Sequence, residues 1–284
     1  KATLEAQFRE LYLASFAPRV VVYKALATGH QLARFYEDLV NPSLRARVAI
    51  FHRRFSTNTF SNWYLAQPFR LLGHNGEINS IAANRNAVRN LEREQRLPAV
   101  LMPQGSDSAD LDRMLELLTV RGLPLDEALL CMMPAAWRDL PAARPEVIRF
   151  YQSVSRMLGS LGAWEGPAAV VATDGKKVVA MLDRMGLRPL RYVITHDDRV
   201  IGASEIGAIE GHPGDVREAG QLDPGEAISI DLDDRRISRA HEILERVLAG
   251  TRFDLGRLGQ QSIVSFSKAS VSATAPTSAP APAP

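Results

Sequence analysis

Residues 168–182 read AAVVATDGKKVVAML, and this stretch decides the fold class. Two runs rich in small and β-branched residues, Ala168–Thr173 and Lys177–Leu182, flank the dipeptide Asp174-Gly175. An Asp-Gly dipeptide between two such runs is typical of a β-hairpin, because both residues tolerate the positive φ angles of a tight turn. The stretch therefore predicts a pair of antiparallel strands.

Strand-like segments continue on both sides of this hairpin. A second hairpin is predicted from residues 191–195 and 200–204, joined by a turn at residues 196–198. The other predicted strands are residues 19–26, 47–55, 69–72 and 227–232.

Helical patterns occupy much of the first half of the chain. Ser106 or Ser108 is a candidate N-cap for a helix that stops near Gly122, and Pro145 stands where a further helix begins. The remaining helical stretches are residues 30–39, 80–96 and 128–133. Helices in one group and hairpin-linked strands in another predict an α+β fold with antiparallel sheets.

Composition excludes several classes of function. The 284 residues carry 34 basic and 32 acidic side chains, a net charge of +2, which gives no electrostatic reason to expect nucleic acid or an anionic membrane as a partner. No apolar run reaches the length of about 18 residues that a membrane span needs. The single cysteine, Cys131, excludes an intrachain disulfide and fits a reducing cytoplasm. No group of cysteines and histidines has metal-ligand spacing.

Three polar segments are candidates for a binding site. Arg54, at the end of a predicted strand, is placed to grip a carboxylate through two parallel hydrogen bonds, or is an ordinary surface arginine. Asn75 and Gly76 can form an oxyanion hole or a plain turn. Asp107, at the start of a helix, can bind an ammonium group or serve as a cap.

Two further features can be explained by a purely structural role. The segment DRMGLRP contains Asp183 and Arg188, which can support a site or form a structural ion pair in a tight loop. Cys131 lies in an apolar helical run, where a free cysteine is usually buried and inert.

Taken together, these segments resemble the class II glutamine amidotransferase domain of the glutamate synthase large subunit. The resemblance is carried by residues 52–80, HRRFSTNTFSNWYLAQPFRLLGHNGEINS, and by four later segments in the same order. It runs from about Tyr12 to about Leu232. The later segments are GSDSADLDRMLELL (105–118), WEGPAAVVATDGKKVVAMLDRMGLRPLRY (164–192), ASEIGAIE (203–210) and GQLDPGEAISIDL (220–232).

The resemblance implies a fold and a reaction. The fold is an N-terminal-nucleophile type αββα sandwich of two antiparallel sheets between helical layers, here lacking its N-terminal portion. In this family an N-terminal cysteine attacks the side-chain amide of L-glutamine with its own α-amino group as base. The released ammonia travels to a second site for the reductive amination of 2-oxoglutarate.

The resemblance also implies cofactors, partners and residue roles. No cofactor is expected in this chain, whereas FMN and an iron–sulfur cluster are expected elsewhere in the parent enzyme. The expected partners are L-glutamine, the remaining synthase domains and, as a further candidate, a small electron-supplying subunit. Arg54 would bind the glutamine α-carboxylate and Asp107 its α-ammonium. Asn75 and Gly76 would form the oxyanion hole, with Asp183 and Arg188 supporting the site.

The sequence departs from the family where the nucleophile is expected, because Lys1 stands at its start and no N-terminal cysteine is present. Residues 1–268 are therefore interpreted as a partial amidotransferase domain, inactive alone. Residues 269–284 are interpreted as a disordered Ala/Pro-rich linker or tail. The alternative is a non-catalytic amidotransferase-like module that binds glutamine or a partner chain. A third hypothesis, an amidotransferase that feeds ammonia to a phosphoribosyl acceptor, is disfavoured by RFSTNT and LAQPFR.

Overall fold

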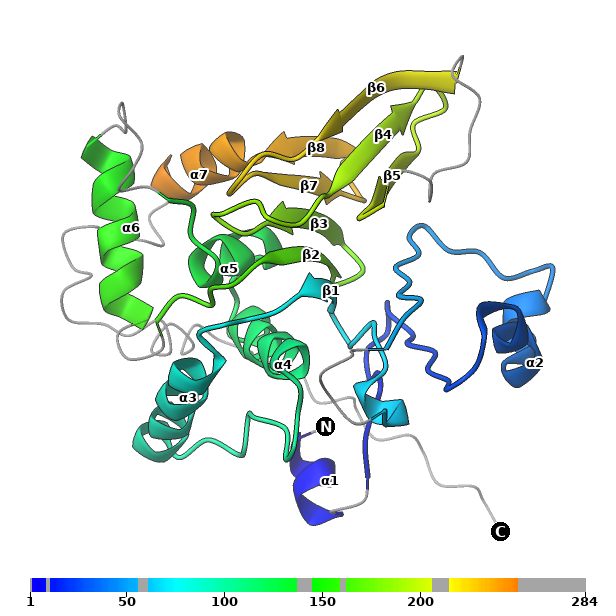
Figure 1. Cartoon of the computed structure of the whole chain (residues 1–284), viewed down its shortest axis with the longest axis horizontal. Helices are drawn as coiled ribbons and strands as arrows, with labels where there is room; N and C mark the ends of the chain where they lie inside the picture. The colour runs from blue at the N-terminus through cyan, green and yellow to red at the C-terminus, as the bar shows by residue number, and fades with distance from the viewer. Residues whose placement is uncertain are drawn as a thin grey trace, which may run out of the picture.

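Two antiparallel sheets form the centre of the molecule. The structure is a computed structural model that describes residues 2–8, 11–55, 61–136, 145–158, 162–205 and 215–249. One sheet has the strand order β1-β2-β3-β7-β8 and the other the order β5-β4-β6 (Figure 1). The strands are β1 (Leu72–Gly76), β2 (Ala168–Thr173), β3 (Lys177–Leu182), β4 (Arg191–Thr195), β5 (Val200–Ala203), β6 (Val216–Gln221), β7 (Ala227–Asp231) and β8 (Arg236–Arg239).

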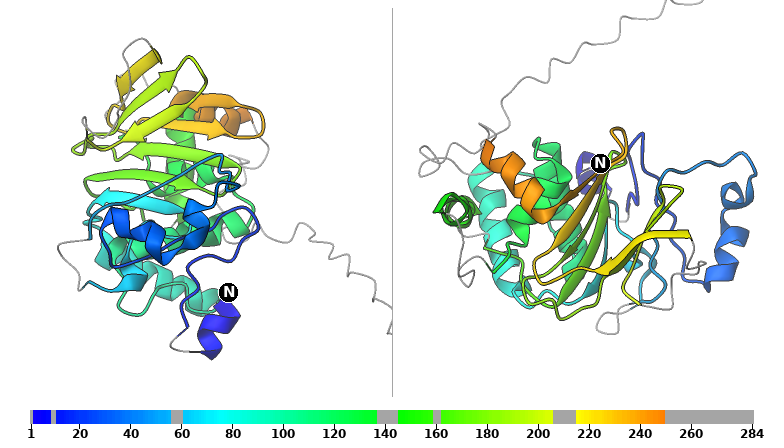
Figure 2. Two further views of the ribbon diagram at one scale, coloured as in Figure 1. Left: turned by 90° about the vertical axis from the view of Figure 1, so that its right-hand side faces the viewer. Right: turned by 90° about the horizontal axis from the view of Figure 1, so that it is seen from above.

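Helices pack against one face of the five-stranded sheet, and the three-stranded sheet lies over the other face (Figure 2). The α-helices are α1 (Ala2–Gln7), α2 (Leu32–Phe35), α3 (Ile81–Gln95), α4 (Asp107–Val120), α5 (Leu125–Met132), α6 (Pro145–Leu158) and α7 (Ala240–Ala249). Short 3-10 helices span Gly29–Gln31, Glu37–Val40 and Trp63–Leu65. The α+β class with stacked antiparallel sheets, predicted from the sequence, is confirmed.

The alternation of side chains along β2 separates two hydrophobic cores. Ala168, Val170 and Ala172 belong to the larger core, which the sheet shares with helices α3 to α7. Ala169 belongs to the smaller core between the two sheets, and Val171 packs against that core. This is the period of two expected of a strand buried on both faces.

Local signals in the sequence placed several elements correctly. The hairpin of β2 and β3 turns at Asp174-Gly175, where Gly175 has φ +81° and the Asp174 carboxylate accepts the Lys176 and Lys177 N–H groups at 2.8 Å. The second hairpin, β4 and β5, is confirmed. Ser106 is the N-cap of α4, since its hydroxyl accepts the Ala109 N–H, and Gly122 follows the helix with φ +95°.

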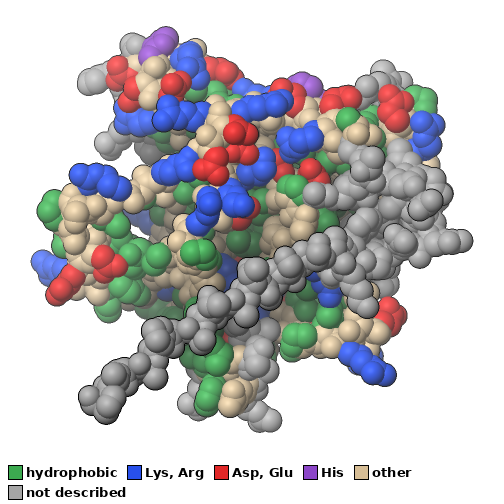
Figure 3. All heavy atoms as spheres, turned by 180° about the vertical axis from the view of Figure 1, so that it is seen from behind, with side chains coloured by type: hydrophobic (Ala, Val, Ile, Leu, Met, Phe, Trp, Pro, Cys, Tyr) green, Lys and Arg blue, Asp and Glu red, His purple; other side chains and the backbone are tan. Residues whose placement is uncertain are grey.

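The predicted strands at residues 19–26 and 47–55 are wrong, because neither segment is paired in a sheet. A strand needs a neighbour for its backbone groups, and each segment exposes large apolar side chains: Val21 is 66% exposed and Phe51 is 83% exposed. Figure 3 shows hydrophobic side chains at the surface on the side where α2 lies. The predicted helix at residues 30–39 is broken into α2 between two 3-10 turns.

The strand predicted at residues 69–72 begins later, because β1 starts at Leu72. A buried carboxylate explains the shift. One oxygen of Asp112 accepts the Leu71 N–H at 2.8 Å and the Leu72 N–H at 3.0 Å, so these groups bond to a side chain of α4. The elements that were not predicted are α1, the 3-10 helix Trp63–Leu65, β6, β8 and α7. Residues 56–60 and the proposed tail, 269–284, lie outside the described residues.

Candidate functional site

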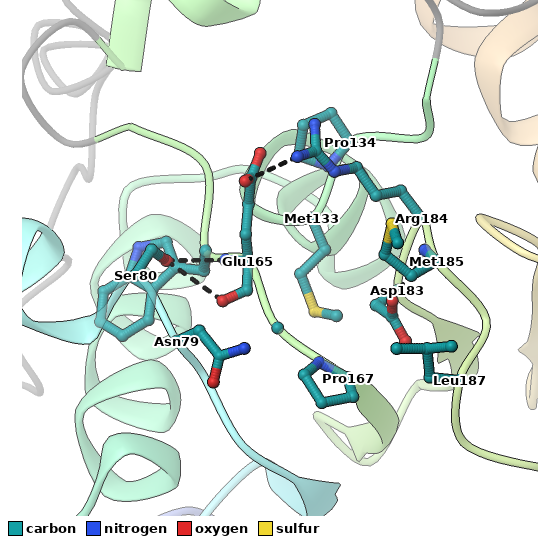
Figure 4. A pocket seen from close by; sticks show the side chains of 12 residues that line it. Asn79, Ser80, Met133, Pro134, Glu165, Pro167, Asp183, Arg184, Met185 and Leu187 are labelled. Carbon is teal, nitrogen blue, oxygen red and sulfur yellow. Dashed lines mark hydrogen bonds and ion pairs between the residues drawn. The ribbon is translucent and has the colours of Figure 1, made fainter.

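A cavity of about 1930 Å³ opens between residues 47–55, strand β1, the start of α4 and the facing sides of the two sheets. Its lining includes Arg54, Asn75, Gly76, Asp107 and Arg188, all of which sequence reasoning named as site residues. Asp183, the remaining candidate, lines a neighbouring pocket of about 400 Å³ (Figure 4). The structure thus brings segments far apart in the chain to one cavity.

Asn75 and Gly76 lie in strand β1, opposite Ala169 and Ala168 of β2. They are therefore strand residues, which corrects the interpretation of a plain turn. Gly76 has φ +139°, and a Cβ added there would lie 1.7 Å from the carbonyl oxygen of Pro167. This position requires glycine because any side chain would collide with the main chain that leads into β2.

Asp107 is the first residue of α4, next to the N-cap Ser106. One carboxylate oxygen accepts the Ile78 N–H at 2.8 Å. The other accepts the N–H and the hydroxyl of Ser108, at 2.7 Å and 3.1 Å. Because Ser106 caps the helix, Asp107 is not its N-cap. A carboxylate at a helix N-terminus is stabilised by the helix dipole and keeps lone pairs for a further donor.

Arg54 is exposed at the edge of the cavity. Within the part of the chain that the structure describes, its guanidinium has no ion-pair partner. Within the described residues, the cavity lining therefore includes an arginine fork of the kind that binds a carboxylate through two hydrogen bonds.

His74 was not singled out by sequence reasoning, yet it is buried beside Asn75 with 2% of its surface exposed. Its Nδ1 lies 2.7 Å from the Ser108 hydroxyl, whereas its Nε2 is buried with no hydrogen-bond partner among the described residues. Burial lowers the pKa of His74 to about 4, against a smaller upward effect of the Asp107 charge. The ring is therefore neutral near pH 7.

Gln67 binds the backbone of His74 from the other side. Its amide nitrogen donates to the His74 carbonyl at 3.0 Å, and its amide oxygen accepts the His74 N–H at 2.6 Å. His52 Nε2 also lies 3.2 Å from the same carbonyl, and burial lowers the pKa of His52. The Gln67 side chain thus takes the place of a neighbouring strand at the edge of β1. The LAQPFR segment contains Gln67, but sequence reasoning gave this residue no role.

Asp183 holds the start of β2 in place. It is 3% exposed, and one carboxylate oxygen accepts the Ala168 N–H at 2.9 Å while the other accepts the Met185 N–H at 2.7 Å. Ala168 is the partner of Gly76, so Asp183 fixes the wall behind the candidate oxyanion residues. The ion pair of this loop is Arg184 with Glu165, at 2.9 Å (Figure 4). The loop therefore holds a structural ion pair, as its alternative interpretation expected, but through Arg184. Among the described residues, Asp183 and Arg188 form no ion pair with each other.

Cys131 lies in α5 and is fully buried. Burial raises the pKa of its thiol, so it is not an activated nucleophile. Among the described residues, no group of three or more His, Cys, Asp or Glu side chains could hold a metal ion. No helix in the same residues is long and apolar enough to cross a membrane.

The sequence matches the class II glutamine amidotransferases over residues 1–254. It is 40% identical over 261 residues to the ferredoxin-dependent glutamate synthase of Pyropia yezoensis, covering 88% of this chain and 17% of that protein. It is 39% identical over 274 residues to ferredoxin-dependent glutamate synthase 2 of Synechocystis, covering 91% of this chain and 17% of that protein. It is 36% identical over 260 residues to the glutamate synthase [NADPH] large chain of Azospirillum brasilense, covering 87% of this chain and 17% of that protein.

Two solved structures are similar to part of this chain. A glutamine phosphoribosylpyrophosphate amidotransferase from B. subtilis, complexed with ADP and GMP, is 20% identical with a TM-score of 0.36, over 66% of this chain and 33% of that one. A second structure, described as the allosteric regulatory enzyme of purine biosynthesis, is 19% identical with a TM-score of 0.38 over the same shares.

The chain spans 17% of the length of the curated relatives named above. The match over residues 1–254 covers all of the residues that the structure describes. The resemblance to the amidotransferase domain of glutamate synthase, predicted from the motifs, is confirmed by these comparisons. The chain belongs to the class II glutamine amidotransferases.

Proposed function

We propose that the large cavity binds L-glutamine and that this domain is the ammonia-releasing half of a glutamate synthase. The observation that carries the proposal is the arrangement of the lining. Arg54 supplies a cation, Asp107 an anion and Asn75-Gly76 hydrogen-bond donors, all at one cavity. A zwitterionic amino acid with an amide side chain needs these three groups.

The two charged residues suit the main-chain groups of glutamine. The Arg54 fork can bind the α-carboxylate through two parallel hydrogen bonds. The Asp107 carboxylate can accept a hydrogen bond from the α-ammonium group, because its present partners are neutral N–H and O–H donors. The Asn75 side-chain amide and the Gly76 N–H are then the candidates to stabilise the oxyanion formed when the side-chain amide is attacked.

The nucleophile of that reaction comes from outside these 284 residues in our proposal. The only cysteine of the sequence, Cys131, is buried in the core and has a raised pKa. We therefore propose that the chain binds glutamine and does not hydrolyse it alone. In the parent enzyme, domains carrying FMN and an iron–sulfur cluster would use the ammonia to aminate 2-oxoglutarate, with a small electron-supplying subunit as a further candidate partner. A reducing compartment such as the cytoplasm suits the free thiol.

The second candidate function is a non-catalytic glutamine-binding or partner-binding module. The same inert cysteine favours it, since binding alone needs no nucleophile. The two functions predict the same contacts with glutamine and differ in whether the parent protein releases ammonia. Measuring ammonia release from L-glutamine by the parent protein separates them.

Binding of two ligands to the purified chain tests the proposal. Glutaramate is glutamine without its α-amino group. It still has the carboxylate that Arg54 would bind, but it has no ammonium group for Asp107. By isothermal titration calorimetry, Arg54→Gln is expected to weaken both ligands, and Asp107→Asn to weaken only L-glutamine. Each loss is expected to be roughly 10- to 100-fold, the usual value of a charged hydrogen bond.

The matched control is Arg236→Gln, because Arg236 is 67% exposed on β8 and outside the cavity lining. This variant should bind both ligands as the unsubstituted chain does. Equal affinities of the Arg54→Gln variant and the unsubstituted chain for L-glutamine would refute the proposed site. Ammonia release from L-glutamine by the chain alone would refute the statement that its nucleophile is external.

A further inference from the structure

A chain of three side chains connects strand β1 to helix α4. His74 Nδ1 lies 2.7 Å from the Ser108 hydroxyl, and that hydroxyl lies 3.1 Å from one oxygen of Asp107. His74 and Ser108 are 2% and 5% exposed, so water does not compete for these contacts. The residues are 34 positions apart along the chain, and their meeting depends on the packing of α4 beside β1.

The number of protons fixes the direction of these hydrogen bonds. The Ser108 hydroxyl has one proton, and the Asp107 carboxylate can only accept. If the hydroxyl donated to His74, its oxygen would lie 3.1 Å from the carboxylate oxygen with no proton between them. Both contacts are hydrogen bonds only if His74 Nδ1–H donates to Ser108 and Ser108 donates to Asp107. His74 then carries its proton on Nδ1, and its Nε2 is an acceptor.

The other oxygen of Asp107 is also held by the segment that follows His74, since it accepts the Ile78 N–H at 2.8 Å. Residues 74–78 therefore fix both oxygens of the carboxylate, one directly and one through Ser108. The same five residues contain Asn75 and Gly76, the proposed oxyanion donors. A shift of this segment would move the donors and the carboxylate together.

We propose that His74 and Ser108 are positioning residues that orient the Asp107 carboxylate toward the α-ammonium group of the substrate. This inference rests on the proposed function, because it assumes that Asp107 binds that group. The competing explanation is that the Ser108 hydroxyl only satisfies buried polar groups at the start of α4. In that case its removal would lower stability and would not distinguish between ligands.

The tautomer of His74 tests the hydrogen-bond chain without any ligand. Two-dimensional 1H–15N correlation spectra of the labelled chain, assigned with a His74→Gln variant, report which ring nitrogen carries the proton. The expected result near pH 7 is a neutral ring protonated on Nδ1. Protonation on Nε2 alone would overturn the inference whether or not glutamine binds.

Ligand discrimination tests the role of the chain in binding. Ser108→Ala is expected to weaken the binding of L-glutamine roughly 10-fold, which is the usual contribution of one charge-assisted hydrogen bond. It should leave the affinity for glutaramate within about twofold, since glutaramate has no ammonium group. Ser108→Thr keeps the hydroxyl and should restore the preference for L-glutamine.

The control is Ser238→Ala, because Ser238 is also 5% exposed but lies on β8, at the opposite edge of the sheet from β1. It should leave the affinities for both ligands unchanged. Equal weakening of L-glutamine and glutaramate by Ser108→Ala, or no weakening of either, would overturn the inference. Loss of binding in Arg54→Gln together with an unchanged Ser108→Ala would leave the proposed function standing and remove the positioning role.

Discussion

At the scale of single residues, burial decides the charge of the histidine beside the proposed oxyanion donors. His74 is 2% exposed, and the Asp107 carboxylate accepts three hydrogen bonds of its own. Desolvation therefore outweighs the attraction of that charge, and the pKa falls to about 4. A neutral ring suits the proposal that Asp107 binds a substrate ammonium, because a second cation there would compete for the carboxylate.

This pKa predicts how stability depends on pH. The ordinary pKa of histidine is 6.5, and that of folded His74 is about 4. Between these values the unfolded chain binds a proton that the folded chain does not, so stability falls as the pH drops from about 6.5 toward 4. The contribution of His74 is complete above about pH 6.5, and on the order of 2 kcal/mol of it is lost near pH 4.5.

Urea unfolding of the unsubstituted chain and the His74→Gln variant, at about pH 7 and about pH 4.5, measures this contribution. The free energy of unfolding should fall on acidification by on the order of 2 kcal/mol less in His74→Gln than in the unsubstituted chain. His241→Gln, at an exposed position on α7, is the control and should behave as the unsubstituted chain. The same acid-induced loss in His74→Gln would show that folding does not perturb His74.

The charged and amide residues of the proposed site were named from the sequence, but His74 and Ser108, which we propose orient Asp107, were not. Arg54, Asn75 and Asp107 stand in recognisable segments with chemistry suited to an amino acid. His74 and Ser108 lie in the same segments, but their contact depends on the packing of two elements. No local pattern states that Nδ1 of one residue meets a hydroxyl 34 positions away.

At the scale of secondary structure, a carboxylate from α4 binds the backbone at the start of strand β1. Asp112 is 3% exposed and accepts the Leu71 and Leu72 N–H groups. Asp112→Ala would leave two buried donors unpaired, at a cost of about 2–4 kcal/mol, and should lower Tm by roughly 5–15 °C. Asp112→Asn keeps an acceptor oxygen and should lose less. Calorimetry of both variants measures these changes in Tm, and an equal decrease in Tm for Asp112→Ala and Asp112→Asn would contradict this account.

Elements with local signals were predicted well, and elements that depend on distant partners were not. The β2–β3 hairpin follows from its Asp-Gly turn, and α4 follows from its serine cap and the glycine beyond its end. Residues 19–26 and 47–55 have strand-like composition but no strand beside them. The opposite error occurred at β6, whose sequence VREAGQ is polar and mostly exposed, so only its pairing with β4 identifies it as a strand.

At the scale of the whole molecule, the two hydrophobic cores have different surroundings. The larger core is closed by helices on one face of the five-stranded sheet. The smaller core lies between the sheets beside the cavity, whose lining includes Ala169 and Ile228 of that core. At about 1930 Å³, the cavity exceeds the volume of roughly 300–1,000 Å³ usual for small-molecule sites. One glutamine would therefore fill only the part near β1 and α4.

The central claim is that L-glutamine binds in that part of the cavity, held between Arg54 and Asp107. A crystal structure of the chain grown with L-glutamine tests it most directly. The predicted result is an intact glutamine with its α-carboxylate on the Arg54 guanidinium, its α-ammonium on Asp107 and its amide oxygen toward Asn75 and Gly76. Glutamine bound elsewhere, or bound here with its α-carboxylate and ammonium away from these two residues, would contradict the claim.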